Sequence, residues 1–179
     1  MFRPYSPGTG EDHSILLRPF VLSGATISVG EAVKLDSTYG CVTNATAGAP
    51  ILGIVVGFTG PYENSLIPGA YAPGSETSSD VTSVTATSST QYRALVETSK
   101  NKQWSVDVNG TLGTTAHSDA IGAGINVDSA NANYGRVLET TATRTAATVT
   151  NFLTLGVDPN DSTRAIVKIA SSQLDRNVS

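Results

Sequence analysis

Short runs of alternating apolar and polar residues are the main pattern along this chain. The clearest is residues 103–108, in which Trp104, Val106 and Val108 fall on one face and polar residues on the other. Residues 51–58 are almost continuously apolar, which is typical of a strand buried on both faces. No segment keeps a helical apolar period between helix caps, so long helices are not expected. The predicted strands are 15–20, 26–35 with a bend at Gly30, 51–58, 81–87, 92–97, 103–108, 136–140, 147–157 and 164–170.

Turn-forming residues separate these predicted strands. Asn109-Gly110 directly follows the clearest strand and is a strong tight-turn pair. Residues 158–161 (Asp-Pro-Asn-Asp) separate the last two strands, as the connection of a hairpin would. The expected fold class is therefore all-β, a small barrel or sandwich with long loops and little helix.

Four regions are expected along the chain. They are an extended N-terminal arm at 1–14, a β-barrel part at 15–100, a second β part packed on it at 101–170, and a C-terminal tail at 171–179. Proline and glycine interrupt the arm, and residues 59–80 and 111–135 form long irregular segments. Large apolar or aromatic groups on an arm or loop need cover, which a partner can supply. The candidate partner-contact residues are Phe2, Arg3, Tyr5, Tyr62, Leu66, Ile67 and Tyr71.

Composition narrows the range of functions. Charged residues are 15% of the 179 residues, whereas 23 Thr and 20 Ser make up about a quarter, which favours sheet and turns over coiled coils or helical bundles. The net charge is −4 and no basic stripe exists, so no nucleic-acid partner is expected. The longest apolar run has eight residues, Ile51 to Phe58, too short for a membrane helix, and no signal peptide is visible. Cys41, the single cysteine, is expected to be a small buried residue in a strand.

Candidate catalytic residues are few. His13 lies beside Glu11 and Asp12, but consecutive residues rarely chelate one metal ion, so a solvated segment is expected. His117-Ser118-Asp119 contains the residue types of a hydrolase triad, yet three consecutive side chains splay apart instead of converging. We therefore expect no enzyme activity.

Candidate ligand sites are equally weak. Gly122-Ala123-Gly124 lacks the third glycine and the following helix of a dinucleotide-binding motif. Asp158, Asn160 and Asp161, and likewise Asp107 with Asn109 and Gly110, resemble parts of a calcium loop without its bidentate glutamate. Such residues also form turns by bonding their own backbone, which is the expected reading. Trp104 is expected in the core. No catalytic, cofactor or metal site is predicted.

Residues 27–60 resemble head decoration (cement) proteins of tailed bacteriophages. The resemblance rests on Gly30 followed by the acidic-apolar strand 31–35, a glycine-centred turn, Ala47-Gly48-Ala49-Pro50, and the apolar strand 51–57 ending in glycine. Residues 92–110 and 135–159 are also similar to small phage virion proteins. The resemblance covers about two-thirds of the chain as a pattern of strands and turns, and it implies a β-tulip-like barrel.

The resemblance implies a non-enzymatic role on the outer surface of the capsid. Such proteins bind the major capsid protein, often as homotrimers, and clamp neighbouring subunits of the assembled head. Deletion of residues 1–14 is then expected to leave the fold intact and to weaken attachment. Two alternatives remain open: another virion component, such as a head fibre base, tail or adaptor protein, and a carbohydrate-binding β-domain. The latter needs an aromatic platform beside carboxylates, for which Trp104 with Asp107 is the candidate.

Overall fold

The computed structural model describes residues 1–5, 16–37, 39–59, 83–87, 92–110, 121–143 and 149–174. Most of these residues lie in β-strands, and no α-helix occurs among them. The all-β class predicted from the sequence pattern is therefore confirmed. None of the described segments forms a helix long and apolar enough to cross a lipid bilayer.

The first half of the chain forms a closed five-stranded sheet, which we call the first barrel. Its strand order is β2 (Leu16–Leu17), β8 (Arg93–Glu97), β6 (Gly53–Thr59), β4 (Ala32–Leu35) and β5 (Val42–Asn44). Residues 19–22 close it, because Val21 N–H donates to the Tyr92 carbonyl (2.8 Å) and Leu22 N–H to the Val42 carbonyl (2.8 Å). A two-stranded ribbon, β3 (Thr26–Ser28) with β7 (Ser83–Thr85), completes this half.

The second half forms another closed sheet, which we call the second barrel. Around it run β9 (Gln103–Asn109), β11 (Asn133–Thr143), β10 (Gly124–Asp128), β12 (Phe152–Asp158) and β13 (Asp161–Ile169), and β13 pairs back onto β9. A single 3₁₀ turn, η1 (Ser129–Asn131), joins β10 to β11. β1 (Arg3–Tyr5) lies antiparallel to the start of β9.

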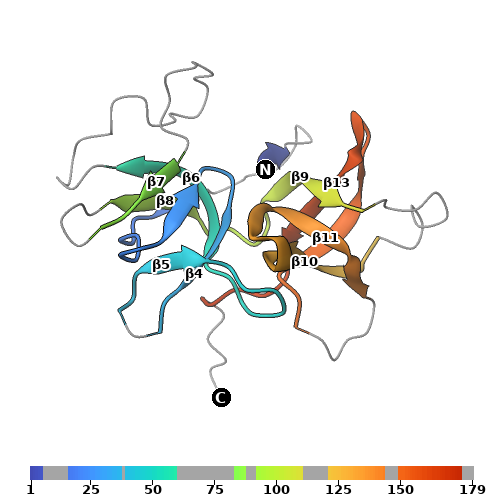
Figure 1. Ribbon diagram of the computed structural model, residues 1–179. Helices are drawn as coiled ribbons and strands as arrows, with labels where there is room; N and C mark the ends of the chain where they lie inside the picture. Colours follow the sequence, from blue (N-terminus) through green and yellow to red (C-terminus); the bar gives the residue numbers. More distant parts are fainter. Residues whose placement is uncertain are drawn as a thin grey trace.

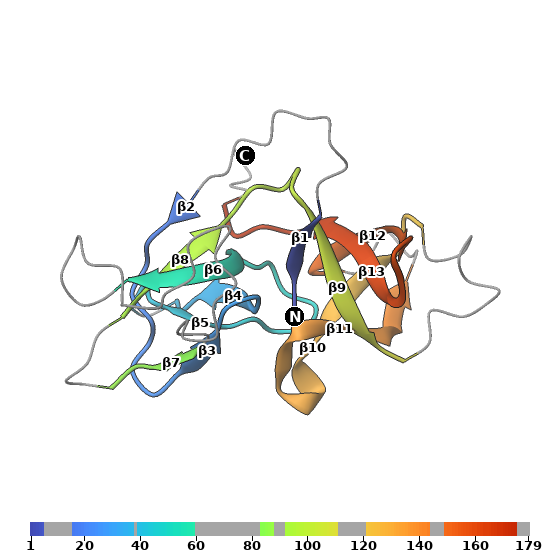
Figure 2. The same cartoon turned by 90° about the horizontal axis from the view of Figure 1, so that it is seen from above.

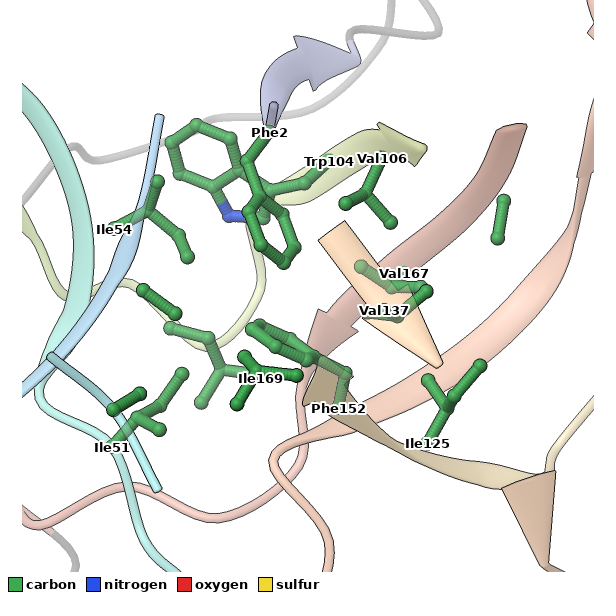
Figure 3. Packing of buried hydrophobic residues seen from close by; sticks show 14 residues of the cluster. Phe2, Ile51, Ile54, Trp104, Val106, Ile125, Val137, Phe152, Val167 and Ile169 are labelled. Atoms are coloured by element: carbon green, nitrogen blue, oxygen red, sulfur yellow. The ribbon is translucent and has the colours of Figure 1, made fainter. Parts of the chain in front are cut away.

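The two barrels lie side by side in both views (Figures 1 and 2), and β1 runs between them (Figure 2). One apolar cluster belongs to the first barrel alone and contains Ile27, Leu52 and Phe58. A second cluster is shared, because Ile51 and Ile54 of the first barrel pack with Trp104 and Phe152 of the second. Figure 3 shows these side chains meeting between the barrels. The shared cluster makes the junction part of the hydrophobic core.

Most predicted strands occur, with shifted ends. The run at 103–108 is β9, and the 158–161 turn joins β12 to β13 as a hairpin. The predicted strand 26–35 is broken at Gly30 into β3 and β4. Residues 124–128 were expected in an irregular segment but form β10, which pairs with both β11 and β12. The alternation in this strand includes only two apolar residues, Ile125 and Val127, and it lies within a long run of small and polar residues.

Candidate functional site

The N-terminal residues pack on the body instead of forming a free arm. Phe2 is 3% exposed, and its ring centroid lies 4.8 Å from that of Phe152. Figure 3 shows its side chain between Trp104 and Phe152. Phe2 N–H donates to the Gly30 carbonyl (3.0 Å), so the segment contacts both barrels. Of the three predicted arm contacts, Phe2 is covered by its own chain, Arg3 is exposed and Tyr5 is half-buried.

Gly30 allows the N-terminus to approach this closely. Its φ is +76°, a left-handed conformation that favours glycine. A Cβ atom there would lie 2.2 Å from Met1 Cγ and 2.9 Å from the Phe2 carbonyl oxygen. A side chain at residue 30 would therefore push Met1 and Phe2 out of the junction.

A chain of charged and polar groups links the N-terminus to the second barrel. Asp107 forms ion pairs with the Met1 ammonium group and with the Arg164 guanidinium group. Arg164 also donates to Ser105 Oγ (2.8 Å), the Ser105 carbonyl (2.7 Å) and the Met1 carbonyl (2.8 Å). Ser105 Oγ in turn donates to Asp158 Oδ2 (2.5 Å). Each donor of this network therefore has an acceptor, which is how a buried arginine is tolerated.

The pKa values of three aspartates in the second barrel depend on their hydrogen-bond and ion-pair partners. Burial acts to raise the pKa of Asp107, but the hydrogen bond and charge of the N-terminal ammonium, with Arg164, hold that pKa below its ordinary value. The Ser105 hydroxyl and the Asn160 amide lower the pKa of Asp158. Asp128 is fully buried, and bonds from Arg136, Asn131 and Asn109 outweigh its burial and lower its pKa. These three groups are held ionised, as in structural ion pairs.

Buried asparagines fasten the loop of residues 45–50 to the second barrel. Asn151 Nδ2 donates to the carbonyls of Thr46 (3.0 Å) and Ala49 (2.6 Å). Asn126 Oδ1 accepts from Gly48 N–H (3.0 Å) and from Asn151 N–H (3.0 Å). The Ala47–Pro50 stretch that carries part of the family resemblance is thus a docking loop between the barrels.

An open pocket of about 630 Å³ lies at the junction between the barrels. β3 contributes Thr26 and Ser28, and β5 contributes Thr43 and Asn44. Glu31 comes from the turn before β4, and Tyr134 comes from β11 of the second barrel. Glu31 Oε2 accepts from Ser28 N–H (2.9 Å) and Asn44 Nδ2 (3.3 Å). Burial raises the pKa of Glu31, although the Ser28 amide and the N-terminal ammonium act to lower it. This carboxyl group therefore differs from the three above, because it has no side-chain cation beside it.

The pocket was not predicted from the sequence. Glu31 and Tyr134 are about a hundred positions apart, and no local motif joins them. One signal was present: Glu31 is the acidic residue of the predicted strand 26–35 and lies directly after its bend at Gly30.

Several segments that resemble parts of ligand sites in the sequence have structural roles. Asp158 Oδ1 accepts from Asn160 N–H and Asp161 Oδ1 from Thr163 N–H, both at 2.9 Å, so the turn reading of this segment is confirmed. Within the described part of the chain, no three His, Cys, Asp or Glu side chains gather to hold a metal ion. Ala123 is buried and Gly124 begins a strand instead of preceding a helix, so the glycine motif is part of the barrel.

The predicted burial is confirmed for Trp104 but not for Cys41. Trp104 is 1% exposed, which confirms its place in the core. A carbohydrate platform of Trp104 with Asp107 is therefore wrong, because the indole ring is not accessible. Cys41 was expected to be buried in a strand, but it is half-buried and lies just before β5.

The remaining candidates lie outside the described residues. These are His13 with Glu11 and Asp12, the segment His117-Ser118-Asp119, and the loop residues Tyr62, Leu66, Ile67 and Tyr71. Their predicted roles stay predictions.

Comparison with known proteins adds no relative. The chain matches no family model, and neither a curated protein nor a solved structure is significantly similar to it. Inferences about function therefore rest on the residues and geometry described above.

Proposed function

We propose that this protein is a decoration protein of a tailed-bacteriophage head, bound to the outer surface of the capsid, where it stabilises contacts between major capsid subunits. The observation that carries the proposal is the fold of residues 27–60, which bear the resemblance to this family. They form one antiparallel unit in which β4 pairs with both β5 and β6, and in which Gly30 turns the chain between β3 and β4. This is the succession of strands and turns that the resemblance implies.

The accessible side chains of β1 are the candidates for attachment to the capsid. Arg3 and Pro4 are exposed on this strand, and Tyr5 is half-buried. Pro4 has no N–H group, so a partner strand could not form a complete ladder of hydrogen bonds with β1. Side-chain contacts from Arg3 and Tyr5 are therefore favoured over strand addition. Phe2 would act indirectly, by fixing β1 to the body.

Several copies that bind together would raise the affinity for the capsid above that of a single contact. If three copies act as a homotrimer, three modest contacts engage one shell together, and their combined affinity exceeds that of each alone. A surface low in charge suits this mode, because attachment then depends on shape and apolar contact and resists salt.

The test is co-sedimentation with expanded, empty heads assembled from the major capsid protein encoded in the same genome. We expect stoichiometric, saturable binding that persists at high salt. Binding to tails but not to heads would instead support an adaptor or tail component. No binding to either would overturn the proposal.

A pair of variants tests the attachment residues. R3A/Y5A removes the two accessible β1 side chains without touching Phe2, and we expect at least about a tenfold loss of affinity for heads. R18A is the matched control, since Arg18 is an exposed arginine on the first barrel. Equal losses in both would show that attachment depends on overall charge and not on β1.

A further inference from the structure

The junction pocket combines a carboxylate, an amide, several hydroxyl groups and one aromatic ring. Its volume of about 630 Å³ lies within the range of roughly 300–1,000 Å³ typical of small-molecule sites. It adjoins a smaller cavity of about 190 Å³, because Ser28 and Glu31 line both. The two barrels build the pocket jointly, so its shape depends on how they dock.

Hydrogen bonds hold the side chains of Glu31 and Asn44 in the pocket lining and leave one acceptor atom of each unoccupied. Glu31 Oε2 is occupied by Ser28 N–H and Asn44 Nδ2, which leaves Oε1 without a partner among the described residues. Because the Asn44 amide nitrogen is committed to Glu31, its carbonyl oxygen is likewise left to accept. The pocket therefore offers oriented acceptors next to the hydroxyl groups of Ser23, Thr43 and Tyr134.

Charge narrows the class of ligand. Among the described residues that line the pocket there is no lysine, arginine or histidine, and Glu31 is the one carboxylate. An anion would meet this carboxylate, and the N-terminal ammonium group that acts on Glu31 is already paired with Asp107, so anionic ligands are disfavoured. The free oxygens of Glu31 and Asn44 only accept hydrogen bonds, whereas the serine and threonine hydroxyls can also donate. Hydroxyl groups of a ligand would therefore donate to Glu31 and Asn44 and accept from the serine and threonine hydroxyls.

We propose that this pocket binds a neutral saccharide of about disaccharide size, with vicinal hydroxyl groups held by Glu31 and Asn44. Tyr134 supplies an aromatic surface with a polar tip, which suits the apolar and hydroxylated faces of a sugar ring. A carboxylate accepts hydroxyl donors more strongly than a neutral group does. Burial disfavours the charged form of Glu31. Keeping a carboxylate at this position therefore has an energetic cost, which a role in binding explains.

The test uses the isolated full-length protein and does not depend on the role on phage heads. Maltose, lactose and N,N′-diacetylchitobiose are titrated at neutral pH and followed by ligand-observed NMR and by shifts of backbone amides. We expect at least one of them to bind, with the affected amides at residues 22–31, 43–44 and 132–134. Binding of none of the three would overturn the proposal.

Two variants with matched controls assign the site. E31Q keeps an oxygen for Ser28 N–H and Asn44 but turns a donor group toward the pocket, so we expect about a tenfold or greater loss of affinity with the fold intact. Its control is D36N, a carboxylate of the same barrel that does not line the pocket. Y134A is expected to weaken binding similarly, with Y39A as control, since Tyr39 is exposed elsewhere on the first barrel.

Two further ligands separate the alternatives. Choline tests a cation site, because a carboxylate beside an aromatic ring can also hold an ammonium group. Sialyllactose tests an anionic sugar. Binding of choline in place of the neutral disaccharides, stronger binding of sialyllactose than of lactose, or saccharide binding that E31Q and Y134A leave unchanged would each overturn the proposal.

Discussion

The two barrels have the same number of strands but are stabilised differently. The first barrel has an apolar cluster of its own, and Glu97, which pairs with Lys102, is the one charged residue buried in its described strands. The described strands of the second barrel bury Asp128, Asp158 and Arg164. Burying charge requires paired partners, so the second barrel depends on a specific network where the first depends on packing. The two barrels have similar topology, but we expect their stability to respond differently to mutation and to acid.

The two barrels also differ in which apolar cluster their buried phenylalanines belong to. Phe152 packs with side chains of both barrels, whereas Phe58 belongs to the cluster of the first barrel alone. Loss of Phe152 therefore damages the junction, while loss of Phe58 damages one side of it.

The largest effect is expected from these two phenylalanines. F152A and F58A should each lower the free energy of unfolding by about 4 kcal/mol, because both side chains are fully buried. In urea, Trp104 fluorescence reports the shared cluster and circular dichroism reports all strands. We expect the two signals to shift together in F152A. In F58A the dichroism should change at lower urea than the fluorescence, and coincident curves there would show that the barrels unfold as one unit.

A smaller effect is expected from the buried arginine. R164M removes the donors to Asp107, the Ser105 carbonyl and the Met1 carbonyl. Asp107 keeps the Met1 ammonium group, but the two carbonyls lose their donor, at a cost of about 3 kcal/mol in the free energy of unfolding. K168M is the matched control on the same strand, since Lys168 is half-buried and no buried acceptor depends on it. Equal urea midpoints for the two variants would contradict the role of the network.

Acid should distinguish the barrels further. Asp107, Asp128 and Asp158 have pKa values lowered in the folded state, so they stabilise the fold above the unfolded pKa of about 3.9. This contribution is lost as the pH falls from about 5 through the lowered values. D128N should flatten the dependence of the thermal midpoint on pH in this range. An unchanged slope would show that Asp128 does not contribute to it.

Sequence reasoning succeeded where a residue pattern is local. The alternation at 103–108 and the 158–161 turn located β9 and the last hairpin, because side-chain period and turn chemistry depend on neighbouring residues. It failed for β10 and β1, because β10 has only two apolar residues and β1 is three residues long and pairs with β9, about a hundred positions away. Phe2 was expected to need a partner for cover, and its own chain supplies that cover. The pocket was beyond local reasoning, since docking of the two barrels brings Glu31 and Tyr134 together.

The smallest effect concerns the segment that follows β13 and returns to the first barrel. Gln173 Oε1 accepts from Leu35 N–H (2.6 Å), and its Nε2 donates to the Leu35 carbonyl (3.4 Å). Q173A should lower the free energy of unfolding by about 1 kcal/mol. Backbone bonds between Ile51 and residues 171 and 173 remain, so the change should be local. In hydrogen exchange we expect the Leu35 amide to exchange faster while the Ile51 amide is unaffected, and Q103A serves as a control variant. Faster exchange at both amides would mean that the whole segment detaches. The side chain of Gln173, and not only its backbone, would then hold the two barrels together.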